Sequence, residues 1–222
     1  VARFGSSEGA WDATPESSER REASERAARA LECAQRAGAR AIASDDEEYP
    51  EALRALPDPP PILFTIGSLA LLRAPCVAIV GTRRATSYGE RVTSELAAAL
   101  ARAGVSVVSG MARGIDGAAH RAALSAGGAT VAVLGTGVDV AYPVAHRPLH
   151  AEIGARGLLL SEELPGDRAT GGSFPKRNRL IAALARATIV VEAPHRSGAL
   201  ITAKCALDLN RDVAAVPGPV DV

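Results

Sequence analysis

The sequence of 222 residues contains few aromatic residues, few cysteines and no long apolar run. Aromatic residues make up 3% of the chain and hydrophobic residues 47%, so a core must be built mainly from Ala, Val, Leu and Ile. No run approaches the roughly 18 uninterrupted apolar residues of a membrane-spanning helix, and we expect no membrane partner. The cysteines Cys33, Cys76 and Cys205 are odd in number and widely scattered. This pattern excludes a disulfide framework and a cysteine metal motif.

Net charge is also absent, because 25 Lys and Arg residues balance 25 Asp and Glu residues. The charges are unevenly spread: residues 1–76 hold 9 basic and 13 acidic residues, and residues 77–222 hold 16 and 12. This distribution excludes a uniformly basic nucleic-acid binder and favours a local basic site in the second part. The sequence begins at Val1 without a basic-then-apolar leader, and together with the scattered cysteines this predicts a cytoplasmic protein.

Short runs of Val, Leu and Ile alternate with Ala-rich helical windows from Val77 onwards. The runs, expected to be strands, lie at 77–80, 105–108, 130–134, 157–160, 188–191 and 213–216. The expected helices lie at 90–103, 114–126, 144–155, 175–187 and 198–209. Continuous apolar runs separated by helices are typical of parallel strands buried on both faces. We therefore predict an α/β fold with a doubly wound, mostly parallel, extended Rossmann-like sheet and a small N-terminal extension.

The first third of the chain is less regular. Residues 1–38 are predicted to be a poorly ordered or helical segment, with helical composition at 17–38, and residues 39–222 to be a Rossmann-like DNA-binding domain. At the start of that domain we expect strands at 39–43 and 62–67, separated by a short helix and a stiff proline-rich connector. We interpret this part as a small lobe or extension that packs on the rest.

The expected strand at 77–80 leads through Gly81, Thr82, Arg83 and Arg84 into a helix. Such a turn leaves free backbone N–H groups and the positive end of a helix dipole at the strand's carboxyl edge, where phosphate is attracted. Arg83 and Arg84 add two guanidinium groups that suit an oxyanion. A tight turn with solvated arginines accounts for the same residues, and the dinucleotide fingerprint G-x-G-x-x-G is absent.

Cations and glycines also follow the other expected strands. The residues concerned are Gly110, Arg113 and Gly114, then Gly135 to Gly137, then Phe174, Lys176, Arg177 and Arg179, and finally Arg196. The carboxyl ends of parallel strands meet at one edge of a sheet, so these side chains are expected to gather there with Tyr88 and Tyr142. Cations beside phosphate-sized nests, with rings on which a base stacks, indicate a site for a nucleotide or a single nucleic-acid strand.

Structural roles compete with binding roles at several of these positions. Lys176, Arg177 and Arg179 cannot share one helix face, so at least one is expected to form a structural salt bridge, with Glu192 or Asp116 as partner. Asp116, Asp139 and Ser197 are also candidates for caps or turns, and His120 for a core or surface position. Glu192 is the strongest carboxylate candidate for a ligand or metal, although an ion pair suits it equally.

The segments together resemble the DNA-processing protein A (DprA/Smf) family of bacterial natural transformation and recombination. The resemblance covers roughly residues 39–222, and the order and spacing of the motifs make it specific. It is carried by Val80–Arg83 with Tyr88–Gly89, Ser109–His120, Leu134–Asp139 with Tyr142–Pro143, Phe174–Ala182, Val191–Ala193, Ser197–Ala203 and Val216–Gly218. No segment of the chain resembles the family's SAM-like or winged-helix-like domains.

The resemblance implies a non-enzymatic protein that binds and protects single-stranded DNA, helps to load the RecA recombinase and forms a homodimer. The resemblance assigns DNA binding to Arg83, Gly110, Arg113, Arg147, Lys176, Arg177 and Arg179. Together with the residues found at the strand ends, the predicted DNA-binding residues are Gly81, Thr82, Arg83, Arg84, Gly110, Arg113, Gly114, Arg147, Phe174, Lys176, Arg177 and Arg179. No catalytic residue, metal or cofactor is predicted, because no nucleophile arrangement, Walker-type loop or His/Cys metal set is present.

The alternative is a nucleotide-hydrolysing enzyme of the lysine-decarboxylase-like phosphoribohydrolase group. Those enzymes use a Pro-Gly-Gly-x-Gly-Thr loop followed by a glutamate. The nearest candidate here, Gly135-Thr136-Gly137, lacks that form, so Glu192 would have to act alone.

Overall fold

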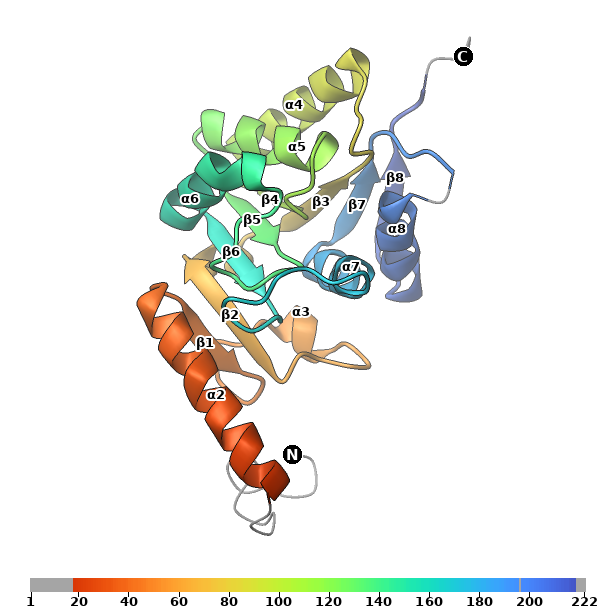
Figure 1. Cartoon of the computed structure of the whole chain (residues 1–222). Coiled ribbons are helices and arrows are strands. Elements are labelled where there is room, and N and C mark those ends of the chain that lie inside the picture. The colour runs from red at the N-terminus through yellow and green to blue at the C-terminus, as the bar shows by residue number, and fades with distance from the viewer. Residues whose placement is uncertain (1–17, 196, 219–222) are drawn as a thin grey trace.

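The structure of the chain is a computed structural model that describes residues 18–195 and 197–218. The described residues form an eight-stranded sheet with helices on both faces, as Figure 1 shows. The strands are β1 (Arg40–Ala43), β2 (Ile62–Gly67), β3 (Cys76–Val80), β4 (Ser106–Ser109), β5 (Thr130–Val133), β6 (Leu158–Ser161), β7 (Ala187–Val190) and β8 (Asp212–Ala215). Their spatial order is β1-β2-β6-β5-β4-β3-β7-β8.

Helices cover the two faces of the sheet in separate groups (Figure 1). One face carries α4 (Ser87–Arg102), α5 (Ile115–Ser125) and α6 (Arg147–Arg156), and the other carries α3 (Glu51–Arg54), α7 (Ser173–Leu184) and α8 (Gly198–Asp208). Ile79 of β3 packs in one apolar cluster with residues of α4 and α5. Its neighbours Ala78 and Val80 pack in another cluster with residues of α7. Both faces of β3 are therefore buried, and this explains its continuous apolar sequence.

The parallel part of the sheet has a topological switch point between β3 and β7. β3 is the central strand and pairs in parallel with β4 on one side and β7 on the other. Val80 lies opposite Val190, so the carboxyl ends of β3 and β7 are adjacent and the loops that follow them diverge to opposite faces. In an open α/β sheet, ligands bind in the crevice at such a point. The doubly wound, mostly parallel sheet predicted from the sequence is confirmed.

The residues before β3 contribute to the same sheet. β1 pairs antiparallel with β2, and β2 pairs antiparallel with β6, so the two strands extend the edge of the parallel sheet. Of the two interpretations of this part, a lobe or an extension, the structure supports an extension, because its strands are hydrogen-bonded into the sheet. The long helix α2 (Ser18–Arg36) lies beside β1 and buries Ala30 and Ala34. The prediction for residues 1–16 lies outside the described residues.

The expected helices and strands agree with the structure to within about two residues at most boundaries. The window at 144–155 divides into a short 3-10 turn, Val144–His146, and α6. The helix expected at 90–103 begins three residues earlier, at Ser87, since the side chain of Thr86 accepts a hydrogen bond from the Gly89 N–H at 3.1 Å. No helix among residues 18–195 and 197–218 is long and apolar enough to cross a membrane.

Candidate nucleic-acid interface

The loop between β3 and α4 carries two exposed arginines, Arg83 and Arg84, at the switch point. Its start is fixed to the neighbouring loop by a hydrogen bond from the Thr82 N–H to the Glu192 carbonyl at 2.7 Å. Its end is fixed by Thr86, whose N–H donates to one Glu192 carboxylate oxygen at 3.0 Å and whose hydroxyl donates to the other. A carboxylate at a helix N-terminus also complements the helix dipole. The loop is therefore held at both ends by Glu192.

The loop between β4 and α5 packs directly against this first loop. The Ile115 N–H donates to the Thr82 carbonyl at 3.2 Å. Gly114 has φ of 71°, and a Cβ at this position would overlap the Thr82 carbonyl oxygen and crowd the Arg83 backbone. Only glycine combines this conformation with so close an approach. Gly114 thereby brings the exposed side chain of Arg113 to the same edge as Arg83.

The amides of the second loop face inward. One carboxylate oxygen of Asp116 accepts hydrogen bonds from the N–H groups of Gly110, at 3.1 Å, and Ala112, at 3.3 Å. The sequence predicts an oxyanion nest here, but Asp116 itself occupies these two donors, so they are not offered to a ligand. Burial raises the pKa of the Asp116 carboxyl, and the neighbouring Arg177 and the two amides act in the opposite direction.

Arg177 is a buried cation beneath the two loops. It is 5% exposed and donates hydrogen bonds to the carbonyl oxygens of Gly110, at 2.8 Å, and Val133. Burial lowers the pKa of Arg177 to about 10, opposed by the Asp116 charge, and the group remains protonated at neutral pH. Arg177 therefore connects the carboxyl ends of β4 and β5 and places a buried positive charge next to the two loops.

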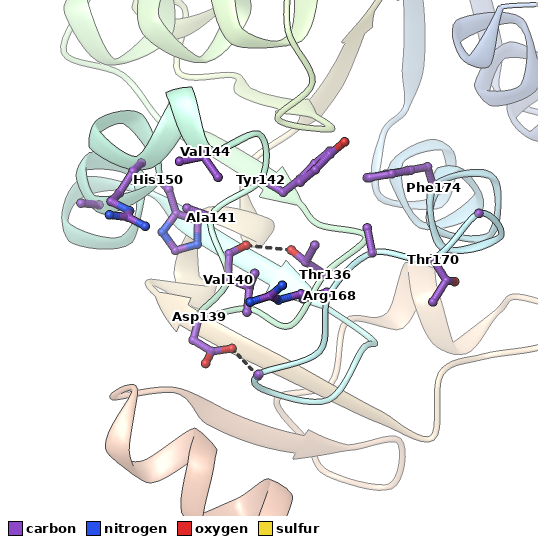
Figure 2. Close-up of a pocket in the computed structure, with 15 residues that line it drawn as sticks. Thr136, Asp139, Val140, Ala141, Tyr142, Val144, His150, Arg168, Thr170 and Phe174 are labelled. Atoms are coloured by element: carbon purple, nitrogen blue, oxygen red, sulfur yellow. Dashed lines mark hydrogen bonds between the residues drawn. The ribbon is translucent and has the colours of Figure 1, made fainter.

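Two aromatic rings, those of Tyr142 and Phe174, lie next to each other in Figure 2. The ring centroids of Tyr142 and Phe174 lie 5.2 Å apart, with an interplanar angle of 34°. The guanidinium of Arg83 lies 5.4 Å from the Phe174 centroid. Close packing of Phe174 depends on Gly135, where a Cβ would lie 2.9 Å from the ring. Cation and rings are thus placed together by two loops and the first turn of α7.

Two adjoining cavities, each of about 580 Å³, open between these loops. Their shared lining residues are Arg83, Arg84, Ala112, Phe174 and Arg177. The first cavity extends over the switch point to Ser197 and Gly198, and the second extends to Arg113 and Tyr142. We call the exposed arginines Arg83, Arg84 and Arg113 the basic rim. In the part of the chain that the structure describes, none of the three forms an ion pair with a carboxylate.

Lys176 and Arg179 have a different environment. Both pair with the same carboxylate oxygen of Glu162, at 3.2 Å and 2.6 Å, and the Glu162 side chain is only 5% exposed. Neither cation lines the two cavities at the basic rim. The sequence predicts a structural salt bridge in this group with Glu192 or Asp116 as the partner. The salt bridge is present, but its acceptor is Glu162, a residue that the sequence analysis did not single out.

Arg147 is the first residue of α6 and lies in a further cavity, which it shares with Arg168. Arg168 comes from the loop between β6 and α7, where no apolar periodicity marks its position. Sequence reasoning missed Arg168; an arginine in a Gly-bearing loop directly before a helix was the available signal. Arg196, which was expected among the cations, lies outside the described residues.

The remaining candidates have structural contacts. Both carboxylate oxygens of Glu192 are engaged by Thr86, and Asp139 accepts from the Gly166 N–H at 2.8 Å. His120 is fully buried and its Nδ1 lies 2.7 Å from the Thr130 hydroxyl, as expected for a core histidine. Ser197 precedes α8 at the N-cap position, but its hydroxyl makes no capping hydrogen bond. Within the described ranges no group of three acidic, His or Cys side chains is arranged to hold a metal ion.

The fold and the basic rim define a Rossmann-like protein with exposed arginines at the carboxyl ends of its parallel strands. A family profile described as DNA recombination-mediator protein A matches residues 40–222. The chain belongs to this DNA-processing family, which includes proteins named DprA and Smf. Protein Smf of Synechocystis is 48% identical over 185 residues, which are 82% of this chain and 46% of the relative. The chain thus spans about half the length of that relative.

Two solved structures share the fold. DNA processing protein A of Streptococcus pneumoniae superposes with a TM-score of 0.79 at 44% identity, over 82% of this chain and 64% of the other. DNA processing protein A of Helicobacter pylori gives a TM-score of 0.76 at 34% identity, over 82% of both chains. The latter structure is described as revealing that protein's single-stranded DNA binding mode.

Proposed function

We propose that the chain binds single-stranded DNA at the basic rim, as a DNA-binding recombination mediator. The observation that carries the proposal is the position of Arg83, which is exposed at a switch-point loop and lies 5.4 Å from the Phe174 ring centroid. A phosphate on the guanidinium and a base against the ring are neighbouring parts of one nucleotide. The single-stranded DNA binding of the Helicobacter pylori relative supports the same assignment.

The rim favours a single strand over a duplex. Phe174 and Tyr142 lie in the walls of cavities of about 580 Å³, where a ring face is reached by an unpaired base but not by a base inside a stacked duplex. Phosphate contacts carry no sequence information, and stacking tolerates every base. We therefore expect binding with little sequence preference.

Among the DNA-binding residues predicted from the sequence, we assign direct phosphate contact to Arg83, Arg84 and Arg113. Gly81, Thr82, Gly110 and Gly114 shape the two loops, and Arg177 supplies charge from beneath them. Lys176 and Arg179 contribute less, because both are paired with Glu162, whose carboxylate offsets one of their two charges. Arg147 belongs to a neighbouring cavity.

The binding assignment is tested by fluorescence anisotropy with a labelled oligothymidine. Arg83→Ala is expected to weaken binding about tenfold and to reduce the dependence of log affinity on log salt by about 0.7. Arg102→Ala is the matched control, since Arg102 is an exposed arginine in the last turn of α4, at the opposite edge of the sheet. Equal affinities of the wild type, Arg83→Ala and Arg102→Ala would exclude the rim as the binding site.

In the cell, we propose, the protein protects incoming single strands in the cytoplasm during natural transformation and helps to load the RecA recombinase on them, without catalysing a reaction. A binder that grips each nucleotide through phosphate and base shields the strand from nucleases and releases it to a partner that competes for the same backbone. RecA-dependent ATP hydrolysis on single-stranded DNA is the readout. A shorter lag with the wild type than with Arg83→Ala is expected, and an identical lag would argue against the loading role.

We further propose a homodimer formed through α8 and the edge strand β8. Leu200 and Leu207 are 42% and 61% exposed and lie seven residues apart, on one face of α8. β8 has no strand partner on its outer side among the described residues. Light scattering of the wild type and of Leu207→Glu tests this proposal: a dimer that the substitution converts to a monomer is expected, and a monomeric wild type would contradict it.

A further inference from the structure

A larger cavity adjoins the basic rim at the Tyr142–Phe174 pair, which contributes to the lining of both. Its volume is about 1020 Å³, within the size range of ligand pockets in proteins. Three segments enclose it: the loop after β5, the start of α6, and the loop at 166–171 before α7 (Figure 2). We call it the Tyr142 cavity, and the residues used below are Tyr142, Val144, Arg147, Arg168 and Phe174.

Two cations enter the Tyr142 cavity from separate segments. Arg147 comes from α6, and Arg168 comes from the opposite loop and lies near Val140 and Thr136 in Figure 2. Both are exposed, and neither forms an ion pair among residues 18–195 and 197–218. The carboxylate in the lining, Asp139, is engaged by the Gly166 N–H. The cavity therefore presents net positive charge to a ligand.

The other walls are apolar and aromatic. Tyr142 is 46% exposed and Val144 is 68% exposed, a large fraction for apolar surface beside a cavity. His150 completes the wall as a neutral group: its Nε2 donates to the Val138 carbonyl at 3.0 Å, and burial lowers its pKa. A flat, uncharged ring fits this surface, with an anion placed between the two arginines.

The Tyr142 cavity is continuous with the basic rim. Phe174 lines all three cavities, and Tyr142 and Val144 line both the Tyr142 cavity and one cavity of the rim. The ring pair therefore lies in a wall that the two cavity systems share. A strand whose phosphates leave the rim reaches the Tyr142 cavity directly past this ring pair.

We propose that the Tyr142 cavity is a second nucleotide subsite, which takes one unstacked nucleotide of the bound strand. Its base lies against Tyr142 and Val144, and its phosphate lies between Arg147 and Arg168. This inference rests on the proposed function, because the same strand must occupy the basic rim. Two adjacent bases are then separated by the ring pair, and the strand is held in an unstacked form.

The proposal predicts a length-dependent loss of affinity. Anisotropy is measured for the full chain with labelled oligothymidines of about 4 to about 20 nucleotides, in the wild type, Arg147→Ala/Arg168→Ala, Arg83→Ala and Arg102→Ala. For long oligonucleotides, the double variant is expected to bind about tenfold more weakly than the wild type, beyond any difference at the shortest length that the wild type binds. Its salt slope with long oligonucleotides falls by about 0.7, for one phosphate. Arg83→Ala loses affinity at every length.

The outcomes separate this inference from the proposed function. If Arg83→Ala weakens binding and the double variant matches Arg102→Ala at every length, the second subsite is overturned while the rim survives. A loss in the double variant that is equal at every length also overturns it, since a separate subsite requires a threshold length. No binding by the wild type at any length overturns both proposals.

A photochemical map gives an independent readout. Oligothymidines with 5-iodouracil at successive positions are cross-linked to the wild type, and the modified peptides are identified by mass spectrometry. Cross-links to Tyr142 from one position and to Phe174 or the basic rim from a neighbouring position are expected. Cross-links confined to peptides of the basic rim would overturn the subsite.

Discussion

The guanidinium of Arg83 lies 5.4 Å from the centroid of the Phe174 ring. The two residues are 91 positions apart in the chain and come from the loop after β3 and from the first turn of α7. Their proximity places charge and π surface at one point of the sheet edge. In the proposed function, the guanidinium binds phosphate by charge and the ring binds a base by stacking, so the two contributions to DNA affinity can be measured separately.

Phe174→Leu separates stacking from charge. Leucine keeps apolar bulk but has no π face, so affinity for single-stranded DNA is expected to fall by about 1–2 kcal/mol while the salt slope stays unchanged. Arg83→Ala lowers affinity and the salt slope together, because it removes a cation. Phe174→Trp restores the ring and is expected to bind within about threefold of the wild type. A reduced salt slope in Phe174→Leu would show that the ring acts by positioning Arg83.

Glu162 holds both Lys176 and Arg179, and its side chain is 5% exposed. Glu162→Gln removes the negative charge that these two cations share, so the free energy of unfolding is expected to fall by about 1–3 kcal/mol in urea titrations. Glu152→Gln is the control: its pair with Arg156 is 45% exposed on the Glu side and should change stability by less than about 0.5 kcal/mol. Equal effects of the two substitutions would contradict a structural role for Glu162.

The contrast between these sites shows how far sequence reasoning reaches. Strand β3 and helix α4 could be predicted from local sequence patterns. An apolar run and an N-cap residue each determine structure within a few positions of the chain. Glu192 lies 106 residues from Thr86, and no local pattern predicts that its carboxylate caps α4. A glutamate after a strand has the same sequence environment whether it caps a helix or binds a ligand.

The same limit applies to pairing and to loops. β1 and β2 were expected as strands from their composition, but their pairing with β6 depends on tertiary packing. The location of Arg83, Arg84 and Arg113 at one edge follows from parallel topology alone. Arg168 lies in a loop without periodicity, so its position in the same cavity as Arg147 is set by the path of that loop.

Gly114→Ala tests the contact between the two loops of the rim. Gly114 and Gly127 have nearly equal φ values of 71° and 73°, but a Cβ at Gly127 would meet no atom within 4 Å. Gly127→Ala therefore measures conformational strain alone, about 1 kcal/mol. Gly114→Ala adds a clash with the Thr82 carbonyl and is expected to cost more stability and to weaken DNA binding by displacing Arg83. Equal destabilisation, with DNA binding intact in both, would show that the loops tolerate separation.

His120 makes stability depend on pH. The Thr130 hydroxyl donates to the Val107 carbonyl, so it accepts from His120 Nδ1–H, and the buried Nε2 has no partner among the described residues. Burial is the largest cause that lowers the pKa of His120 to about 3. The nearby charges of His146, Arg177 and Arg121 lower it further. Protonation would therefore place an unsatisfied charge in the core.

The sign of the effect follows from the lowered pKa. The unfolded chain binds a proton at His120 near pH 6.5 and the folded chain does not, so stability is lost as the pH falls below about 6.5 and continues to fall towards pH 3. Between pH 7 and pH 5 this amounts to about 2 kcal/mol. His120→Asn keeps a donor near the Nδ1 position without a titrating group. Urea unfolding at both pH values should give a smaller pH dependence for this variant, because other titrating groups, including Asp116 and His150, are common to both proteins. If the free energy of unfolding depends on pH equally in the wild type and in His120→Asn, then His120 binds a proton in the folded chain as it does in the unfolded chain.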